Sequence, residues 1–259
     1  MNGIGQWTLV SYLIERLGVA GTLGATFITV GGVFLCILIP YLLGSLNFGV
    51  MISRRRFGDD VRTHGSGNAG ATNMLRTYGK KAAILTLLGD MAKAALAVAL
   101  GYLIVGTNVE LFDEATGATL RYKDQFGAAI AGLFVMLGHM FPIFFKFKGG
   151  KGVATSGMVI LMISPITCLF CLFVFITVVV GTRYVSMGSI MGLTLYPIIL
   201  TAFSRGQNPT ACMIAVLMAL LVVFMHRENI KRILNRTESK ISFKKKSSKT
   251  TEGNEEIQA

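Results

Sequence analysis

The chain has 259 residues, of which 53% are hydrophobic and only 15% are charged. Typical soluble domains carry about 25% charged residues, so this composition excludes an ordinary soluble protein. The formal net charge of +12 would suit a nucleic-acid-binding protein, but Lys and Arg gather in a few short connections between apolar runs. We therefore expect a protein that is embedded in a membrane with a fixed orientation, and we expect no nucleic acid partner.

The first part of the chain precedes the long apolar runs. Residues 1–28 contain one acid and one base, Glu15 and Arg16, and they lack the basic start of a cleavable signal peptide. We interpret residues 1–28 as an N-terminal extension that forms an interfacial helix.

Apolar runs with the length of membrane spans follow. A helix needs about 20 residues to cross a hydrocarbon core about 30 Å thick. The runs are residues 29–53, 82–108, 126–145, 152–182, 184–204 and 206–226. They lack the regular polar face of a helix in a soluble core, so we predict an all-α integral membrane protein that folds as a helical bundle.

The distribution of Lys and Arg predicts the orientation of these runs. The connection at 53–81, the loop at 146–151 and the segment at 227–249 are basic and are expected in the cytoplasm. The connection at 107–125 is mainly acidic and is expected outside. The first run then crosses from outside to inside, which places the N-terminus outside and the C-terminus in the cytoplasm.

One apolar run must return to the side it left, because six full crossings would leave the basic tail outside. We assign this return to residues 152–182, since Ser164 and Pro165 divide that run into two short helices and Arg183 then lies on the basic side. Five full spans and this hairpin give seven membrane helices. The alternative makes 152–182 a full span and 184–226 the hairpin.

These assignments define three parts of the chain. The extension at 1–28 is followed by a transmembrane domain at 29–240. Residues 241–259 are basic and then acidic, and we expect them to form a disordered tail.

A glycine-rich turn leads into an apolar helix at residues 148–156, with the sequence KGGKGVATS. Glycine lets backbone amides approach a phosphate, and the N-terminus of a helix carries partial positive charge. Lys151 adds a full positive charge. The spacing is not that of a Walker A loop. The segment therefore predicts a phosphate-binding loop, with a flexible turn that carries interfacial lysines as the alternative.

A second polar cluster lies at residues 62–76, RTHGSGNAGATNMLR, on the same predicted side as Lys151. Its two arginines suit bidentate phosphate binding. Upstream, Ser45 and Asn47 lie in the cytoplasmic half of the first span, where unpaired polar groups are costly. A helix contact made by a small serine is the alternative for Ser45.

Ionisable residues also occur within the apolar runs and at their ends. Asp90 and Lys93 are one helical turn apart inside the second span, which favours a structural ion pair, with a supporting role in the polar site as the alternative. His139 precedes the glycine-rich loop and either packs at a helix end or serves the site. His226, at the end of the last run, suits proton transfer near neutral pH, and Asn229 shares its helix face.

Together these segments resemble the acyl-phosphate:glycerol-3-phosphate acyltransferase family. The resemblance is carried, in family order, by residues 44–47, 62–76, 138–155 and 226–230. It implies a multi-pass enzyme of the bacterial inner (cytoplasmic) membrane whose active site faces the cytoplasm. Such an enzyme transfers a fatty acyl group from acyl phosphate to the 1-hydroxyl of glycerol 3-phosphate, giving 1-acylglycerol 3-phosphate (lysophosphatidic acid) and phosphate. This is the first step of phospholipid biosynthesis.

The resemblance also implies roles for individual residues. Ser45 and Arg62 fall in the first family motif, and residues 149–152 fall in the loop that binds glycerol phosphate. The third motif contains His226, Asn229 and Glu238. A further serine-bearing connection of the family matches Ser186 and Ser189. The long insert at 107–125 departs from the shorter connection expected for the family.

The chemistry of such a transfer fits these residues. Both substrates are phosphate anions and one has an apolar tail, so the site needs cationic cradles beside a groove open to lipid. The residues expected to act in catalysis are His226, Asn229, Ser45 and Arg62. The residues expected to bind substrate or phosphate are Lys151, Gly149, Gly150, Gly152, Ser66, Asn68, Thr72, Asn73, Arg76, Ser186, Ser189, His139 and Glu238.

An acyl phosphate is already activated, so we expect no protein nucleophile, no cofactor and no metal. Either a phosphate oxygen of the substrate or His226 takes the proton of the attacking hydroxyl. The expected partners are acyl phosphate, glycerol 3-phosphate, membrane lipid and an upstream enzyme that forms acyl phosphate. The alternative function is a transporter of phosphorylated metabolites, but the sequence lacks the internal repeat that such transporters usually carry.

Overall fold

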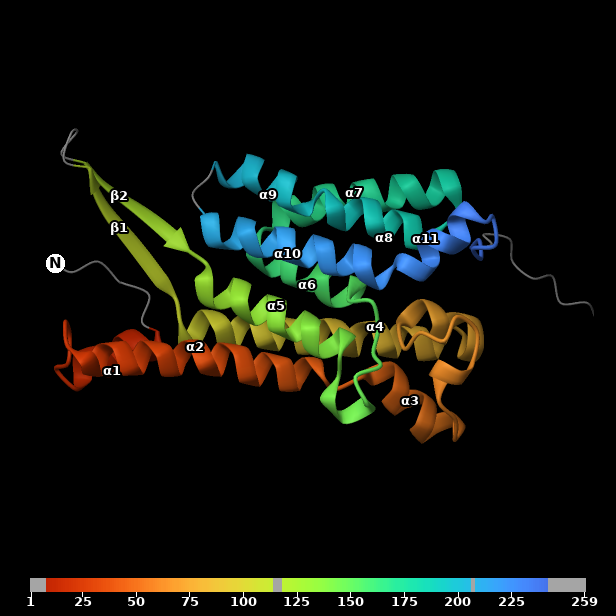
Figure 1. The fold of residues 1–259 in the computed structure, drawn as a ribbon, viewed down its shortest axis with the longest axis horizontal. Coiled ribbons are helices and arrows are strands. Elements are labelled where there is room, and N and C mark those ends of the chain that lie inside the picture. The colour runs from red at the N-terminus through yellow and green to blue at the C-terminus, as the bar shows by residue number, and fades with distance from the viewer. Residues whose placement is uncertain (1–7, 114–117, 206–207, 242–259) are drawn as a thin grey trace, which may run out of the picture.

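The computed structural model describes residues 8–113, 118–205 and 208–241. The start of the predicted extension and nearly all of the predicted tail at 241–259 lie outside the described residues. The described chain forms an elongated bundle of helices (Figure 1). Five of its helices are long and apolar enough to cross a membrane, or up to six if a bent pair near the C-terminus counts as one span.

The N-terminal extension contains helix α1, Leu9–Arg16, which begins with a capping box formed by Thr8 and Ser11. Helix α2 follows at Leu23–Gly44, so the first apolar helix begins earlier than the predicted residue 29. Val10 of α1 packs in one buried cluster with Cys36 of α2 and Ile104 of α4. The extension is therefore packed against the bundle.

Helix α2 ends where its glycine meets another helix. A methyl group at Gly44 would collide with the carbonyl oxygen of Val135 in helix α5, Phe126–Met140. Small residues let membrane helices approach closely and gain van der Waals contact. After α2 the chain turns and enters helix α3, Phe48–Phe57, whose first turn is capped by the side chain of Asn47. The predicted first span thus consists of two helices.

Helix α4, Ala71–Ile104, contains a break at Gly79, where φ is 84°. A left-handed backbone conformation of this kind is accessible to glycine at little cost. The break separates a short segment that carries polar residues from the apolar part of α4, which agrees with the predicted second span at 82–108.

The acidic insert folds as a β-hairpin, which corrects the prediction of an all-α chain. Strands β1, Thr107–Asp113, and β2, Ala118–Asp124, pair antiparallel with Thr107 opposite Asp124. Polar and apolar residues alternate along much of both segments in the sequence, a pattern that favours strands over helices. The membrane part of the described chain is helical.

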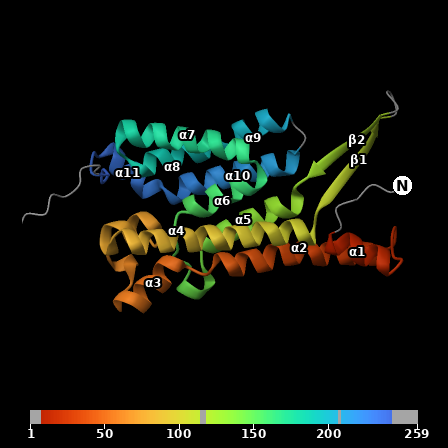
Figure 2. The same cartoon turned by 180° about the vertical axis from the view of Figure 1, so that it is seen from behind.

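The rest of the chain forms the second half of the bundle. After α5 and the 3₁₀ turn η2, Ile143–Phe145, come α6 Val153–Ile163, α7 Pro165–Thr182, α8 Val185–Thr194, α9 Tyr196–Ser204, α10 Pro209–Met225 and α11 Arg227–Leu234. Figures 1 and 2 show that α6 and α7 run in opposite directions. Ser164 caps α7, and Pro165 occupies its first turn. The predicted break at these two residues is confirmed, although α7, with 18 residues, is itself long enough to span.

The bundle has two distinct ends (Figures 1 and 2). We call the end that carries α3, α11 and the polar segments 61–70 and 146–152 the site end. The opposite end, which carries α1 and the β1–β2 hairpin, is the hairpin end. Between them lies a buried apolar core, with Val98 of α4, Met136 of α5, Val159 of α6 and Met218 of α10 among its members.

Candidate active site

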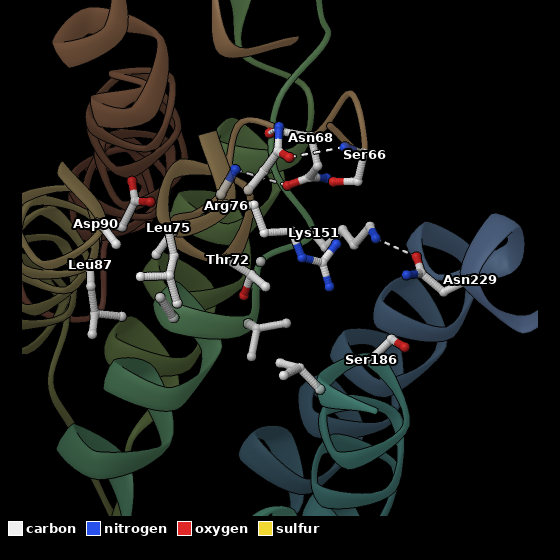
Figure 3. A pocket seen from close by; sticks show the side chains of 18 of the residues that line it. Ser66, Asn68, Thr72, Leu75, Arg76, Leu87, Asp90, Lys151, Ser186 and Asn229 are labelled. Atoms are coloured by element: carbon white, nitrogen blue, oxygen red, sulfur yellow. Dashed lines mark hydrogen bonds between the residues drawn. The ribbon is translucent and has the colours of Figure 1, made fainter. Parts of the chain in front are cut away.

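A cavity of about 670 Å³ opens at the site end of the bundle. Its polar lining comes from segments that are far apart in the sequence. These residues include Ser66, Asn68, Thr72, Asn73, Arg76, Lys80, Lys151, Ser186, His226, Asn229 and Glu238. Figure 3 shows Thr72 and Arg76 on one side of this space and Ser186 and Asn229 on the other, with Lys151 reaching towards Asn229.

The first wall is the loop of residues 61–70, and Asn73 holds it in place. The side-chain nitrogen Nδ2 of Asn73 lies 3.0 Å from the carbonyl oxygens of Val61 and His64 and 2.9 Å from that of Asn68. Its Oδ1 accepts the amide hydrogen of Ser66 at 2.9 Å. Asn73 is buried, and its hydrogen-bonding groups are used within the loop. It is thus an organising residue of this wall.

The second wall is the glycine-rich loop and the start of α6. Gly152 adopts φ 78° and precedes the helix, and the amide of Ser156 makes the first helical bond, to the carbonyl of Gly152, at 2.8 Å. The amides of the first turn of an α-helix have no acceptor within the helix. The residues from Lys151 to Ala154 line the cavity. The amides of the first turn of α6 and the partial positive charge of its N-terminus therefore lie at the cavity, where they favour an anion.

The third wall is a hydrogen-bonded network centred on Glu238. Its Oε1 accepts from Ser186 Oγ at 2.7 Å and from Asn229 Nδ2 at 2.6 Å, and its Oε2 accepts from Arg232 Nε at 2.7 Å. Asn229 Oδ1 in turn accepts from Lys151 Nζ. The network therefore connects the loop before α6 with α8, α11 and the segment after α11.

The charges of this network affect each other. Burial lowers the pKa of Lys151 to about 8, and the nearby positive charge of Arg232 acts in the same direction, while Glu238 opposes it. Burial would raise the pKa of Glu238, but hydrogen bonds from Arg232, Ser186 and Asn229 lower it below its ordinary value. At neutral pH the site thus contains an ammonium group of reduced pKa beside an ionised, fully engaged carboxylate.

His226 lies at the bend between α10 and α11, where the helix axis turns by 54°. Its Nδ1 is 2.8 Å from the carbonyl oxygen of Val222. Because a carbonyl oxygen can only accept, Nδ1 carries the proton and Nε2 is the acceptor atom of the ring. His226 is buried and lines the cavity, so it offers a neutral hydrogen-bond acceptor.

The other half of the cavity is apolar. Its lining includes Ile84 and Leu87 of α4 and Leu172 and Phe175 of α7. Ile84 and Leu172 are also about half exposed at the surface of the bundle, where lipid would lie. The cavity can therefore hold an anionic group at its polar half and an alkyl chain along its apolar half. In the described part of the chain, no group of three His, Cys, Asp or Glu side chains is placed to hold a metal ion.

Comparison with known proteins identifies the family. A family model described as glycerol-3-phosphate acyltransferase matches residues 34–236. The glycerol-3-phosphate acyltransferase of Clostridioides difficile (strain 630) is 39% identical over 208 residues, which are 80% of this chain and 95% of that protein. The corresponding protein of Neisseria meningitidis serogroup B is 41% identical over 205 residues, or 79% of this chain and 95% of the relative. The chain belongs to the glycerol-3-phosphate acyltransferase family.

Solved structures share the fold of this acyltransferase. PlsY (YgiH), an integral membrane glycerol 3-phosphate acyltransferase, matches in its glycerol 3-phosphate form with a TM-score of 0.69 and 34% identity, covering 81% of this chain and 96% of that chain. Its lysophosphatidic acid form matches with a TM-score of 0.66 and 32% identity. The family resemblance that the motifs predicted is therefore confirmed.

Most of the residues predicted for the acyltransferase site lie together. The predicted residues that line the cavity are Ser66, Asn68, Thr72, Asn73, Arg76, His139, Lys151, Gly152, Ser186, His226, Asn229 and Glu238. They come from four segments of the sequence that only the fold brings together. Their individual roles remain predictions.

Arg62 and Ser45 lie outside the cavity lining, and their predicted contacts with phosphate stay predictions. Arg62 binds the carboxylate of Asp60 and donates Nη1 to the carbonyl oxygens of Phe145 at 3.0 Å and Lys148 at 2.9 Å. Ser45 Oγ donates to the carbonyl of Tyr41 at 2.9 Å and accepts from the amide of Ile143 at 3.3 Å. In the structure both side chains hold backbone segments.

Gly149, Gly150 and Ser189 also lie outside the cavity lining, and their predicted roles stay predictions. The amide of Gly149 donates to the carbonyl of Met140 at 3.1 Å, and that of Gly150 donates to the carbonyl of His139 at 3.0 Å. These two amides are therefore bonded to the end of α5. The backbone that lines the cavity belongs to residues 151–154. Ser189 Oγ donates to the carbonyl of Val185 in its own helix at 2.9 Å.

Some lining residues were not predicted. Lys80 lines the cavity, whereas in the sequence it is one of several basic residues in the connection at 53–81. Arg232 fixes Glu238 and was likewise counted only in the basic segment at 227–249. Leu87 and Phe175 line the apolar half, but nothing distinguishes them in the sequence from other apolar residues of their spans.

Proposed function

We propose that this acyltransferase takes a fatty acyl group from an acyl phosphate and transfers it directly to the 1-hydroxyl of glycerol 3-phosphate. The products are 1-acylglycerol 3-phosphate (lysophosphatidic acid) and phosphate. The observation that carries the proposal is the continuity of one cavity, in which a cationic polar half meets an apolar half that reaches the lipid-facing surface. The solved relatives, described as glycerol 3-phosphate and lysophosphatidic acid forms, support the same pair of substrate and product.

In this proposal each phosphate group has a cationic or amide-lined place. The first turn of α6 and Lys151 hold one phosphate, since the amide groups and the ammonium converge there. Arg76 and the loop of Ser66 and Asn68 receive the other. The alkyl chain of the donor lies between α4 and α7.

The transfer is a single displacement. The 1-hydroxyl oxygen attacks the acyl carbon, the bond between that carbon and the phosphate oxygen breaks, and phosphate leaves. The hydroxyl proton passes to a phosphate oxygen of the substrate. His226 accepts a hydrogen bond through Nε2 and orients the hydroxyl, so His226→Ala should reduce kcat only partly, by about 10- to 100-fold. Complete loss of turnover in that variant, with substrate binding retained, would instead make the histidine the base.

The donor is tested with purified protein in liposomes. Labelled glycerol 3-phosphate is incubated with palmitoyl phosphate, with palmitoyl-coenzyme A or with palmitoyl-acyl carrier protein. We expect rapid formation of lysophosphatidic acid from palmitoyl phosphate and a negligible rate from either thioester, with no covalent acyl-enzyme on rapid quenching. A faster rate with a thioester, or a trapped acyl-enzyme, would contradict the proposal.

We further propose that the protein lies in the bacterial inner membrane with seven membrane helices, its N-terminus outside and its C-terminus and site end in the cytoplasm. Basic residues gather at the site end, and α6 with α7 returns the chain to that end. Acyl phosphate then reaches the cavity from membrane lipid, supplied by an upstream enzyme that forms it.

Single-cysteine labelling tests this orientation. The native cysteines are replaced first, and one cysteine is then introduced at Ser204, at the hairpin end, or at Lys81, at the site end. A membrane-impermeant thiol reagent applied to spheroplasts should label only the cysteine at position 204, and lysis should expose the other. The reverse pattern would overturn the orientation.

A further inference from the structure

Three ionisable side chains are buried inside the bundle beside the polar cavity, where the proposed transfer gives them no chemical task. Asp90 is 1% exposed, Lys93 4% and His139 3%. Lys93 Nζ lies 2.9 Å from Asp90 Oδ1 and 3.1 Å from His139 Nδ1. Ionisable groups at this depth are expensive and tend to serve a site or pair with one another. We call these residues the buried triad.

Lys93 joins the triad to the end of α2. Its ammonium donates to the carbonyl oxygens of Gly44 at 2.9 Å and of Leu46 at 2.7 Å. The last carbonyls of a helix lack donor partners within it, and Lys93 supplies donors where α2 ends. A simple ion pair with Asp90 would not require these two bonds.

The end of α2 holds the segment after α5. Tyr41 Oη donates to the carbonyl oxygen of Phe141 at 2.9 Å, and the amide of Ile143 donates to Ser45 Oγ at 3.3 Å. The position of Lys93 therefore affects residues 141–143 through α2. This segment continues directly into the glycine-rich loop.

His139 joins the triad to the glycine-rich loop itself. Its carbonyl oxygen accepts the amide of Gly150 at 3.0 Å. A methyl group at Gly150 would collide with Nε2 of the His139 ring, so the loop backbone lies directly on the imidazole. The next residue, Lys151, lines the polar half of the cavity, as do Asp90 and His139.

We propose that Asp90, Lys93 and His139 are positioning residues that set the place of Lys151 and of the α6 N-terminus. Lys93 fixes the end of α2 through its bonds to two carbonyl oxygens. The ring of His139 packs against the glycine-rich loop at Gly150. The inference rests on the proposed function, because it assigns the phosphate-binding task to the segment that the triad holds.

The first experiment separates positioning from simple charge pairing. Asp90→Asn and Lys93→Met each leave one buried charge without its partner, and both should lower the unfolding temperature. The double variant removes both charges, so its unfolding temperature should recover above that of either single variant. Methionine cannot donate to the carbonyls of Gly44 and Leu46, so the double variant should still show a KM for glycerol 3-phosphate raised about tenfold or more. Lys81→Met, an exposed change on the same helix, is the control and should leave KM unchanged.

A double variant with recovered unfolding temperature and wild-type KM would overturn the proposal. Failure of the proposed function would look different, because the wild-type protein itself would then show no turnover with palmitoyl phosphate. The KM measurement also separates a displaced loop from a general loss of active protein, which would lower kcat alone.

A second experiment tests the contact between the ring and the loop, and it stands even if the Lys93 variants do not fold. Gly150→Ala should raise the KM for glycerol 3-phosphate about tenfold or more, because its methyl group collides with the ring. In Gly150→Ala/His139→Ala the ring is absent, and the loss should be clearly smaller than the sum of the two single effects. Additive losses would show that the ring does not support the loop, and would overturn the proposal.

Discussion

The loop at 61–70 and the loop at 141–152 face the same cavity, but they are held in different ways. The first is organised by Asn73, which follows it closely in the sequence and binds its backbone directly. The second is held from outside by Arg62, by the end of α2 and by His139. A loop with its own organiser is a local unit, whereas the second loop depends on the packing of the whole bundle.

The largest effect is expected at the organiser of the first loop. Asn73→Ala removes the three bonds to the carbonyls of Val61, His64 and Asn68 and the acceptor of the Ser66 amide, and each lost bond costs about 0.5–1.5 kcal/mol. We expect kcat/KM to fall at least about 100-fold. Asn73→Asp keeps the acceptor for Ser66 but not the donors, and should be nearly as damaging.

The control for this loop is His64→Ala, which removes an exposed side chain paired with Asp59. Steady-state kinetics should show less than about a threefold change, since exposed ion pairs contribute little. Equal damage from His64→Ala and Asn73→Ala would mean that the loop has no single organiser.

The second loop is tested through Arg62. If Arg62 served phosphate as a point charge, Arg62→Lys would keep that charge and much of the activity. If it holds the carbonyls of Phe145 and Lys148, as its contacts indicate, lysine cannot reach Asp60 and both carbonyls together. We therefore expect kcat/KM to fall by on the order of 10- to 100-fold in Arg62→Lys, with Arg54→Lys, an exposed partner of Asp60, near wild type.

The charge carried by the second loop predicts a pH dependence. The pKa of Lys151 is lowered to about 8, so its ammonium is complete below that pH and is lost as the pH rises through it. The kcat/KM for glycerol 3-phosphate should fall about tenfold per pH unit above pH 8. In Lys151→Arg the side chain stays charged, and this alkaline fall should disappear. A wild-type profile that stays level to pH 10 would remove Lys151 from the binding of substrate.

The smallest effect is expected at the wall formed by the Glu238 network, which both loops face. Ser186→Ala removes a hydrogen bond to Glu238 and should raise the KM for glycerol 3-phosphate up to about tenfold. Ser189→Ala removes a bond within α8 only and should stay within about twofold of wild type. Titration of both variants with glycerol 3-phosphate measures the difference, and equal effects would place Ser189 in the site after all.

The membrane helices could be predicted because length and hydropathy act locally. Pro165 and the capping Ser164 also marked a true break, since proline cannot continue a helix that needs its N–H. The end of α2 at Gly44 was not found, because the close approach of Val135 in α5 at that glycine is a tertiary contact. The β-hairpin was missed although its alternating sequence favours strands.

The site was predictable as a set but not in its contacts. Lys151, Asn229 and Glu238 lie in separate motifs, and the structure brings them into one network. Arg62 was predicted to bind phosphate because a guanidinium suits phosphate, and in the structure it binds the Asp60 carboxylate and two carbonyl oxygens 83 and 86 residues further along the chain. A motif states which chemical groups are present, while only the fold decides what each group touches.

The short length of α6 has a consequence for the shape of the cavity. Since α6 ends after 11 residues at Ile163, the chain turns back at once and α7 returns along the cavity. One hairpin therefore supplies both the helix N-terminus at the polar half and the wall of Leu172 and Phe175 at the apolar half. The separation between the anion and the start of the alkyl groove is built into a single unit of the chain.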